Sequence, residues 1–122
     1  MERNYDSNCY ITRTYLKKVE NGDTSSYDMK PIYGFMDKYV SEEDNAHYNE
    51  VSPLIIDALE HKEEREKLYD YLYEEVFLYL NKQLENKNYY EAYKRYKVSL
   101  ISLEDELVRP YLLTKIARTV KK

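Results

Sequence analysis

The sequence has few of the residues on which common catalytic and metal-binding motifs depend. Its 122 residues include only two glycines, one cysteine and two histidines. Two glycines are too few for a glycine-rich phosphate-binding loop, and a single cysteine excludes an internal disulfide and a cysteine-based metal cluster. Cys9 has no histidine near it in the sequence, and no Gly-x-Ser-x-Gly motif occurs. We therefore expect a protein that is not an enzyme and that carries no cofactor and no metal.

Strongly apolar residues are also scarce, and they are unevenly distributed. Leu, Ile, Val and Phe together make up 28 residues, a fraction only slightly above the level at which disorder is expected (about 20%). Residues 1–50 hold six of these 28, and residues 51–122 hold the other 22. We therefore expect a helical core domain at 51–122 and a weakly apolar N-terminal arm at 1–50 that packs irregularly on it. The 16 tyrosines must supply the missing buried area.

Long hydrophobic runs are missing. The longest uncharged apolar run, Val76–Leu80, is far shorter than the roughly 20 residues of a membrane span, and residues 1–8 lack the apolar stretch of a signal peptide. With one cysteine, this pattern predicts a cytoplasmic protein. Asn, Lys, Tyr, Ile and Glu are prominent, while Gly, Ala and Pro are scarce, as AT-rich genomes produce. We therefore expect a small accessory or inhibitor protein of a virus or mobile element that binds a host protein machine.

The C-terminal part shows helical periodicity, and the predicted fold is an all-α small helical bundle. Ser52-Pro53 is a typical helix start, and nothing between residues 54 and 85 breaks a helix. One helix of about 32 residues is favoured, while two helices hinged in the polar block 60–67 are the alternative. A turn at 86–88 then predicts an antiparallel helical hairpin. Pro110 is expected to break or kink the chain and to start a last helix that turns Leu112, Leu113, Ile116 and Val120 inward.

The first 50 residues are compatible with two readings. Apolar residues between 8 and 20 fit one helical face, with Gly22 as the C-terminal cap. Asn21-Gly22 is also a hairpin signal, which would make 9–19 and 24–32 strands. We favour the helix. Residues 31–40 are expected to form another short helix, and residues 41–49 a polar, acidic loop.

The apolar residues of the predicted helix 54–85 fall on more than one line. One line, which includes Val76, faces the hairpin partner. Phe77 lies about 100° from Val76 and cannot face the same partner helix. A domain this small covers only part of such a circumference, so we expect a protein interface, including homo-oligomer formation. Its predicted residues are Tyr73, Phe77 and Leu84.

Nucleic-acid binding is the alternative function. Residues 89–97 interleave tyrosines with basic residues, a composition that can stack bases and hold phosphates. The tail from Val108 to Lys122 carries five basic residues and no acidic residue, which suits a polyanion or an acidic partner. The candidate residues are Tyr90, Lys94, Lys97, Arg109, Lys115, Arg118, Lys121 and Lys122.

One charged cluster has the spacing of metal ligands. Asp57, His61 and Glu64 would share one face of a continuous helix, and their side chains suit zinc, manganese or iron. In carboxylate bundles, however, such groups come in pairs from facing helices, and the other histidine, His47, lies in a predicted loop. We therefore interpret the cluster as a solvated, charged helix face.

Overall fold

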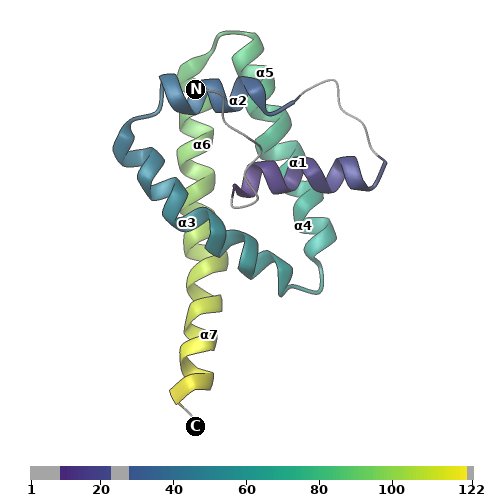
Figure 1. Ribbon diagram of the computed structural model, residues 1–122, viewed down its shortest axis with the longest axis vertical. Coiled ribbons are helices and arrows are strands. Elements are labelled where there is room, and N and C mark those ends of the chain that lie inside the picture. Colours follow the sequence, from purple (N-terminus) through teal and green to yellow (C-terminus); the bar gives the residue numbers. More distant parts are fainter. Residues whose placement is uncertain (1–8, 23–27, 121–122) are drawn as a thin grey trace.

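The computed structural model describes residues 9–22 and 28–120, most of which are helical (Figure 1). No strand occurs in these two ranges. The chain is an all-α helical bundle, which confirms the predicted fold class. Its elements, in chain order, are α1 (Tyr10–Glu20), α2 (Lys30–Lys38), α3 (Glu42–Glu60), α4 (Arg65–Leu72), the π-helical turn η1 (Tyr73–Leu78), α5 (Tyr79–Glu85), α6 (Tyr89–Leu103), the π-helical turn η2 (Glu104–Val108) and α7 (Arg109–Val120).

The segment for which helix and hairpin were both considered is a helix. Residues 10–20 form α1, and Gly22 follows it with a φ of 81°, a left-handed conformation that glycine adopts without a steric penalty. The helix reading is therefore confirmed and the hairpin reading is wrong. Part of the alternative second strand lies outside the described residues. Residues 30–38 form α2, as expected for the second short helix.

The predicted acidic loop at 41–49 is wrong, because this segment forms the first half of α3. The Ser41 hydroxyl accepts a hydrogen bond from the Asp44 backbone N–H at 3.1 Å. Acidic side chains in the first turn also favour the positive end of the helix dipole. Pro53 lies inside this helix rather than at its start. The predicted domain boundary at residue 50 consequently falls within α3.

The predicted helix of about 32 residues is wrong as well. The helix α3 ends at Glu60, and α4 begins at Arg65, so the hinged alternative is confirmed. The polar block between them has no apolar side chain to hold a continuous helix against the core. Leu59 and Tyr69, which flank the break, are both buried, and the Tyr69 hydroxyl donates to the Glu60 carboxylate at 3.2 Å.

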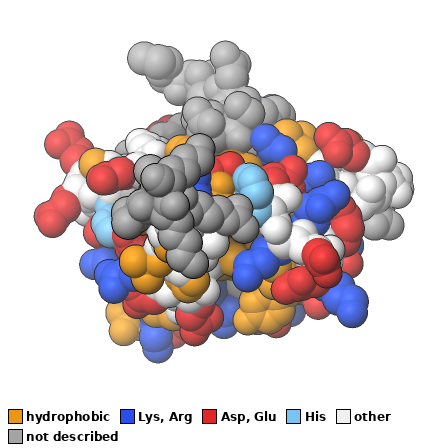
Figure 2. Space-filling model, turned by 90° about the horizontal axis from the view of Figure 1, so that it is seen from below, with side chains coloured by type: hydrophobic (Ala, Val, Ile, Leu, Met, Phe, Trp, Pro, Cys, Tyr) orange, Lys and Arg blue, Asp and Glu red, His pale blue; other side chains and the backbone are white. Residues whose placement is uncertain are grey.

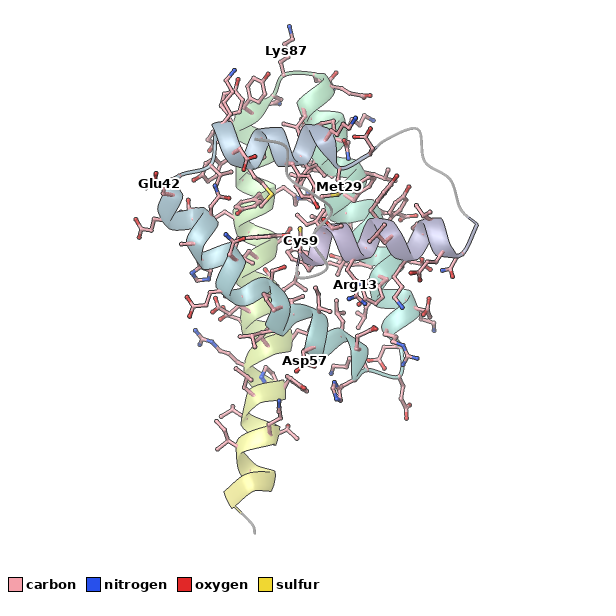
Figure 3. All side chains as sticks on the ribbon, in the orientation of Figure 1. Cys9, Arg13, Met29, Glu42, Asp57 and Lys87 are labelled. Atoms are coloured by element: carbon pink, nitrogen blue, oxygen red, sulfur yellow. The ribbon has the colours of Figure 1, made fainter. Side chains whose placement is uncertain are left out.

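The predicted hairpin is present between α5 and α6, which lie in contact and run antiparallel (Figure 1). Lys87 adopts the left-handed conformation in the turn, with a φ of 56°. Asn88 caps α6 by accepting a hydrogen bond from the Glu91 N–H at 3.4 Å. Lys87 marks the tip of the hairpin in Figure 3.

The predicted break at Pro110 does not occur. The chain stays helical from Tyr89 to Val120, and the wide turn η2 directly precedes the proline. Proline has no N–H to donate and its ring crowds the preceding turn, and a π-type turn is one of the ways in which a helix absorbs such a local irregularity. As a result α7 continues α6 and projects beyond the rest of the bundle (Figure 1).

Residues 9–22 and 28–50 contribute to the core and do not form an irregular arm. Cys9 lies at the centre of the bundle, with 4% of its surface exposed (Figure 3). The count of Leu, Ile, Val and Phe missed this contribution because tyrosine and methionine supply much of it. The fully buried side chains of this part include Tyr10, Ile11, Met29, Ile32, Met36 and Tyr48.

Candidate interaction surfaces

The predicted interface at Tyr73, Phe77 and Leu84 is not a free surface. Phe77 is 0% exposed, because the Tyr15 ring of α1 stacks on it with the centroids 5.1 Å apart. The Tyr73 ring stacks on the same phenylalanine at 5.2 Å and has the Lys18 ammonium 5.3 Å from its centroid. Leu84 is partly buried against the core. The N-terminal helix therefore covers the line that was expected to meet a second chain.

The exposed apolar side chains concentrate instead on the continuous helix α6–α7. Five of the eight large hydrophobic residues that are exposed in the described part of the chain lie between residues 89 and 120. Figure 2 views the molecule from the end where α7 projects and shows hydrophobic side chains at the surface among charged ones. Four of the five are aliphatic: Val98 (53% exposed), Ile101 (47%), Leu113 (65%) and Ile116 (58%).

The position of α7 corrects the expectation that its apolar residues point inward. Leu113 and Ile116 are exposed, and Leu112 is only partly buried. The Val120 side chain lies outside the described part. Since α7 projects beyond the bundle, no other described element covers its outer turns.

The first turns of α7 are held to α3 by one carboxylate. Asp57, which is labelled on α3 in Figure 3, accepts a hydrogen bond from the Tyr111 hydroxyl at 2.6 Å. The Lys115 ammonium lies 3.9 Å from the same carboxylate, and the His61 ring packs 5.2 Å from the Tyr111 ring. These contacts fix the direction in which α7 leaves the bundle.

The same contacts bear on the possible metal ligands. Asp57 lies on α3, His61 follows the end of that helix and Glu64 precedes α4, so the three residues do not share one helix face. The His61 Nδ1 atom lies 2.8 Å from the Asp57 backbone carbonyl oxygen. Within the described ranges, no group of three His, Cys, Asp or Glu side chains is arranged to hold a metal ion.

A groove of about 610 Å³ lies between α6 and the helical segment formed by α4, η1 and α5. The Arg95 guanidinium joins its two walls, because it donates to the Glu75 backbone carbonyl at 2.8 Å and lies 3.2 Å from the Glu75 carboxylate. The same guanidinium covers the Tyr79 ring at 3.9 Å. Tyr71, 61% exposed, and Val98 add apolar area to the groove.

A second, shallower depression of about 510 Å³ is lined by four tyrosines and two lysines. Tyr39, which follows α2, and Tyr89 of α6 stack with their centroids 4.3 Å apart, and their mutual hydrogen bond raises the pKa of the Tyr89 hydroxyl. Tyr90 is 74% exposed. We call this the tyrosine pocket, and its lining residues are Tyr39, Tyr89, Tyr90, Tyr93, Lys94 and Lys97.

One carboxylate borders the tyrosine pocket. The Tyr93 hydroxyl donates to Asp44, and the Lys97 ammonium lies 3.6 Å from the same carboxylate. The hydrogen bond from Tyr93 and the charge of Lys97 lower the pKa of Asp44. The carboxylate therefore stays ionised and partly offsets the positive charge of Lys97.

The structure brings some of the predicted nucleic-acid residues together and leaves others apart. Tyr90, Lys94 and Lys97 share the tyrosine pocket. Arg109 is exposed and pairs with Asp105 at 3.3 Å, and Lys115 lies beside Asp57, both at a distance from that pocket along the helix. The Arg118 side chain, Lys121 and Lys122 lie outside what the structure describes.

Sequence reasoning missed three residues of this pocket. Tyr89 and Tyr93 were not among the candidate residues, although both lie half-buried on α6. Tyr39 directly follows α2, fifty positions earlier in the chain than Tyr89. The alternation of tyrosine and lysine in α6 is a local signal, whereas nothing local identifies Tyr39.

Comparison of the chain with protein-family models, curated proteins and solved structures gives no match. None of the helices in the described ranges combines the length and the apolar character that crossing a membrane requires. The interaction surfaces described above therefore have to be interpreted from their own chemistry.

Proposed function

We propose that the chain is a non-catalytic protein-interaction module that acts in the cytoplasm. The observation that carries the proposal is the apolar face of α6–α7, where Leu113 and Ile116 are 65% and 58% exposed on a helix that projects from the bundle. An amphipathic helix with exposed apolar residues three positions apart is the usual element of helix-in-groove recognition. The accessory or inhibitor role in a virus or mobile element rests on composition and is part of the same proposal.

Charged residues beside this face can orient a partner, although Arg109 is already paired with Asp105 and Lys115 with Asp57. The helix α7 contains Arg109, Lys115 and Arg118 and no acidic residue. Burial of its aliphatic side chains would stabilise a complex by roughly 25 cal/mol per Å² of apolar area removed from water. Opposite charge at the rim would speed association and align the two surfaces.

The test compares two variants that add the same charge at exposed aliphatic positions. Leu113→Glu changes the projecting helix, while Val19→Glu, at a site 47% exposed on α1, is the matched control. Tagged full-length chains are incubated with extract of the organism that encodes the protein, and bound proteins are purified for titration calorimetry. We expect Leu113→Glu to weaken binding of a specific partner at least about 30-fold and Val19→Glu to leave it unchanged. Equal binding by both variants would contradict the proposal.

The tyrosine pocket favours a second candidate function, binding of single-stranded nucleic acid. Tyr90 offers an exposed ring on which a base can stack, and Lys94 and Lys97 can contact phosphates beside it. The stacked pair Tyr39–Tyr89 gives the pocket an apolar wall. The formal net charge of −4 opposes general attraction of a polyanion, so any such binding depends on this local patch.

This candidate predicts binding that falls steeply as salt increases, because phosphate contacts release counterions. We expect Lys94→Glu with Lys97→Glu to abolish binding of a labelled single-stranded oligonucleotide in fluorescence anisotropy, with helicity unchanged. The charge-matched control is Lys62→Glu with Lys67→Glu, two exposed lysines in and after the α3–α4 turn. Absence of binding at 50 mM salt, or equal loss in both variants, would remove nucleic acid as a candidate.

A further inference from the structure

Six exposed residues of the continuous helix α6–α7 form a pattern whose spacing is symmetric and whose two halves are complementary, with an acid in one half at the position of a base in the other. Two aliphatic residues are followed by an acid, a base and two more aliphatic residues, at spacings of three, four, four, four and three positions. The centre of the pattern is the level of Leu107. The six residues are Val98, Ile101, Asp105, Arg109, Leu113 and Ile116, and all of them are exposed.

The spacing places the six residues along one side of the helix. Val98 and Ile116 are 18 positions apart, which would be five full turns at 3.6 residues per turn; the wider turn η2 between them makes the rotation somewhat smaller and keeps the six residues on one side. The buried residues Leu100 and Leu107 lie on the side that faces the bundle. The pattern is therefore an uninterrupted outer stripe, about 27 Å long at 1.5 Å per residue.

A palindromic stripe fits a second copy of itself when the two helices run antiparallel. With a two-fold axis at the level of Leu107, Val98 lies opposite the second copy's Ile116, and Ile101 lies opposite the second copy's Leu113. The same axis puts Asp105 opposite the second copy's Arg109. Within one chain, these two charged residues already form an exposed pair at 3.3 Å. The antiparallel pairing thus matches apolar with apolar and acid with base along the whole stripe, as an isologous two-fold interface requires.

A parallel pairing lacks this complementarity. It would place Asp105 beside its own copy and Arg109 beside its own copy, and like charges that face each other destabilise a helix pair. The charged centre of the stripe therefore selects the antiparallel direction.

The shape of the molecule accommodates the antiparallel arrangement. The helices α3 and α5 and the turn η1 pack against α6, while α7 projects beyond the bundle (Figure 1). In an antiparallel pair, the bundle of the second copy lies beside α7, where the first copy has no bundle. The two bundles then occupy opposite ends of the helix pair.

We propose that the chain forms a symmetric homodimer in which the two α6–α7 helices pack antiparallel through this stripe. The inference rests on the proposed function, because it names a second copy of this chain as a partner of the exposed helix. It replaces the expected self-association through Tyr73, Phe77 and Leu84, which are buried or partly buried in the bundle.

Sedimentation equilibrium of the full chain over a micromolar concentration range tests the dimer. We expect the wild-type chain and the Val19→Glu control to dimerise. Leu113→Glu, which enters a symmetric interface twice, should weaken dimerisation at least about 30-fold. A chain that stays monomeric, or a dimer that Leu113→Glu leaves unchanged, would overturn the proposal. A monomer that still binds a foreign protein through Leu113 would overturn only this inference, whereas loss of both kinds of binding would overturn the proposed function too.

Cysteine cross-linking tests the register. Val98→Cys and Ile116→Cys chains are prepared separately, mixed, oxidised mildly and separated on a non-reducing gel. The native Cys9 is buried and serves equally as background in all samples. We expect a disulfide-linked dimer in the mixture and little in either variant alone, because like positions lie about 27 Å apart. Efficient cross-linking of Val98→Cys with itself would overturn the antiparallel register.

Discussion

Replacement of Phe77 with alanine is expected to lower the free energy of unfolding by about 3–5 kcal/mol, the usual cost of removing a buried aromatic ring. The ring is 0% exposed and lies between Tyr15 and Tyr73, with centroid distances of 5.1 and 5.2 Å. Neither neighbouring ring can fill the space without leaving its own packing, so a cavity would remain. Urea unfolding followed by circular dichroism measures the change.

The matched control is Leu113→Ala, which removes an aliphatic side chain that is 65% exposed. We expect this variant to unfold within about 0.5 kcal/mol of the wild type, as for most surface substitutions, while it weakens association. Phe77→Ala should instead lower the free energy of unfolding strongly and leave the association of the folded chain unchanged. A Phe77→Ala chain that unfolds like the wild type but associates less would restore Phe77 as a surface anchor and contradict the packing described here.

The contrast between Phe77 and Leu113 shows what sequence periodicity could and could not predict. Spacing correctly separated Phe77 from the hairpin seam, because a helix rotates about 100° per residue. The residue that covers Phe77 is Tyr15, more than sixty positions earlier in the chain. No local pattern identifies such a contact, so the second apolar line was assigned to a partner. Leu113 was expected to point inward, because Pro110 suggested that a separate helix begins there and packs against the bundle.

Other wrong predictions concerned segments whose local sequence did contain the correct signal. Ser41 followed by three acidic residues is a helix start, with a cap and favourable charges in the first turn, yet the polarity of the segment suggested a loop. The palindromic stripe is likewise present in the sequence. Its residues form one continuous surface only because the helix continues through Pro110, since a break there would separate Ile101 from Leu113. The tyrosine pocket needed α2 to bring Tyr39 to α6, and only tertiary packing does so.

Tyr48 is one of the residues that connect the N-terminal helix to the rest of the core. Its side chain is 1% exposed on α3, and its ring stacks on Tyr96 of α6 with the centroids 5.4 Å apart. Its hydroxyl lies 2.7 Å from the Cys9 Sγ atom and accepts a hydrogen bond from the Ile11 N–H at 3.5 Å. Burial raises the pKa of this hydroxyl, so the group stays protonated near neutral pH.

We expect Tyr48→Ala to lower the free energy of unfolding by about 3–5 kcal/mol, because it removes a buried ring between three helices. Tyr48→Phe separates the contribution of the hydroxyl. It should cost about 1–3 kcal/mol, since the buried Ile11 N–H loses an acceptor and Cys9 a partner. Urea unfolding of both variants provides the measurement.

Tyr10→Phe is the matched control, because Tyr10 is equally buried and its ring lies 5.5 Å from that of Tyr48. Among the described residues, however, the Tyr10 hydroxyl has no hydrogen-bond partner. A buried hydroxyl without a partner destabilises the folded state, so its removal should leave stability unchanged or raise it. The two tyrosine-to-phenylalanine substitutions are therefore expected to change stability in opposite directions within one cluster of rings. Equal losses in both would show that the Tyr10 hydroxyl contributes as much as the Tyr48 hydroxyl and would contradict this assignment, whereas no loss in Tyr48→Phe would show that the ring, and not the hydroxyl, holds α1 against α3.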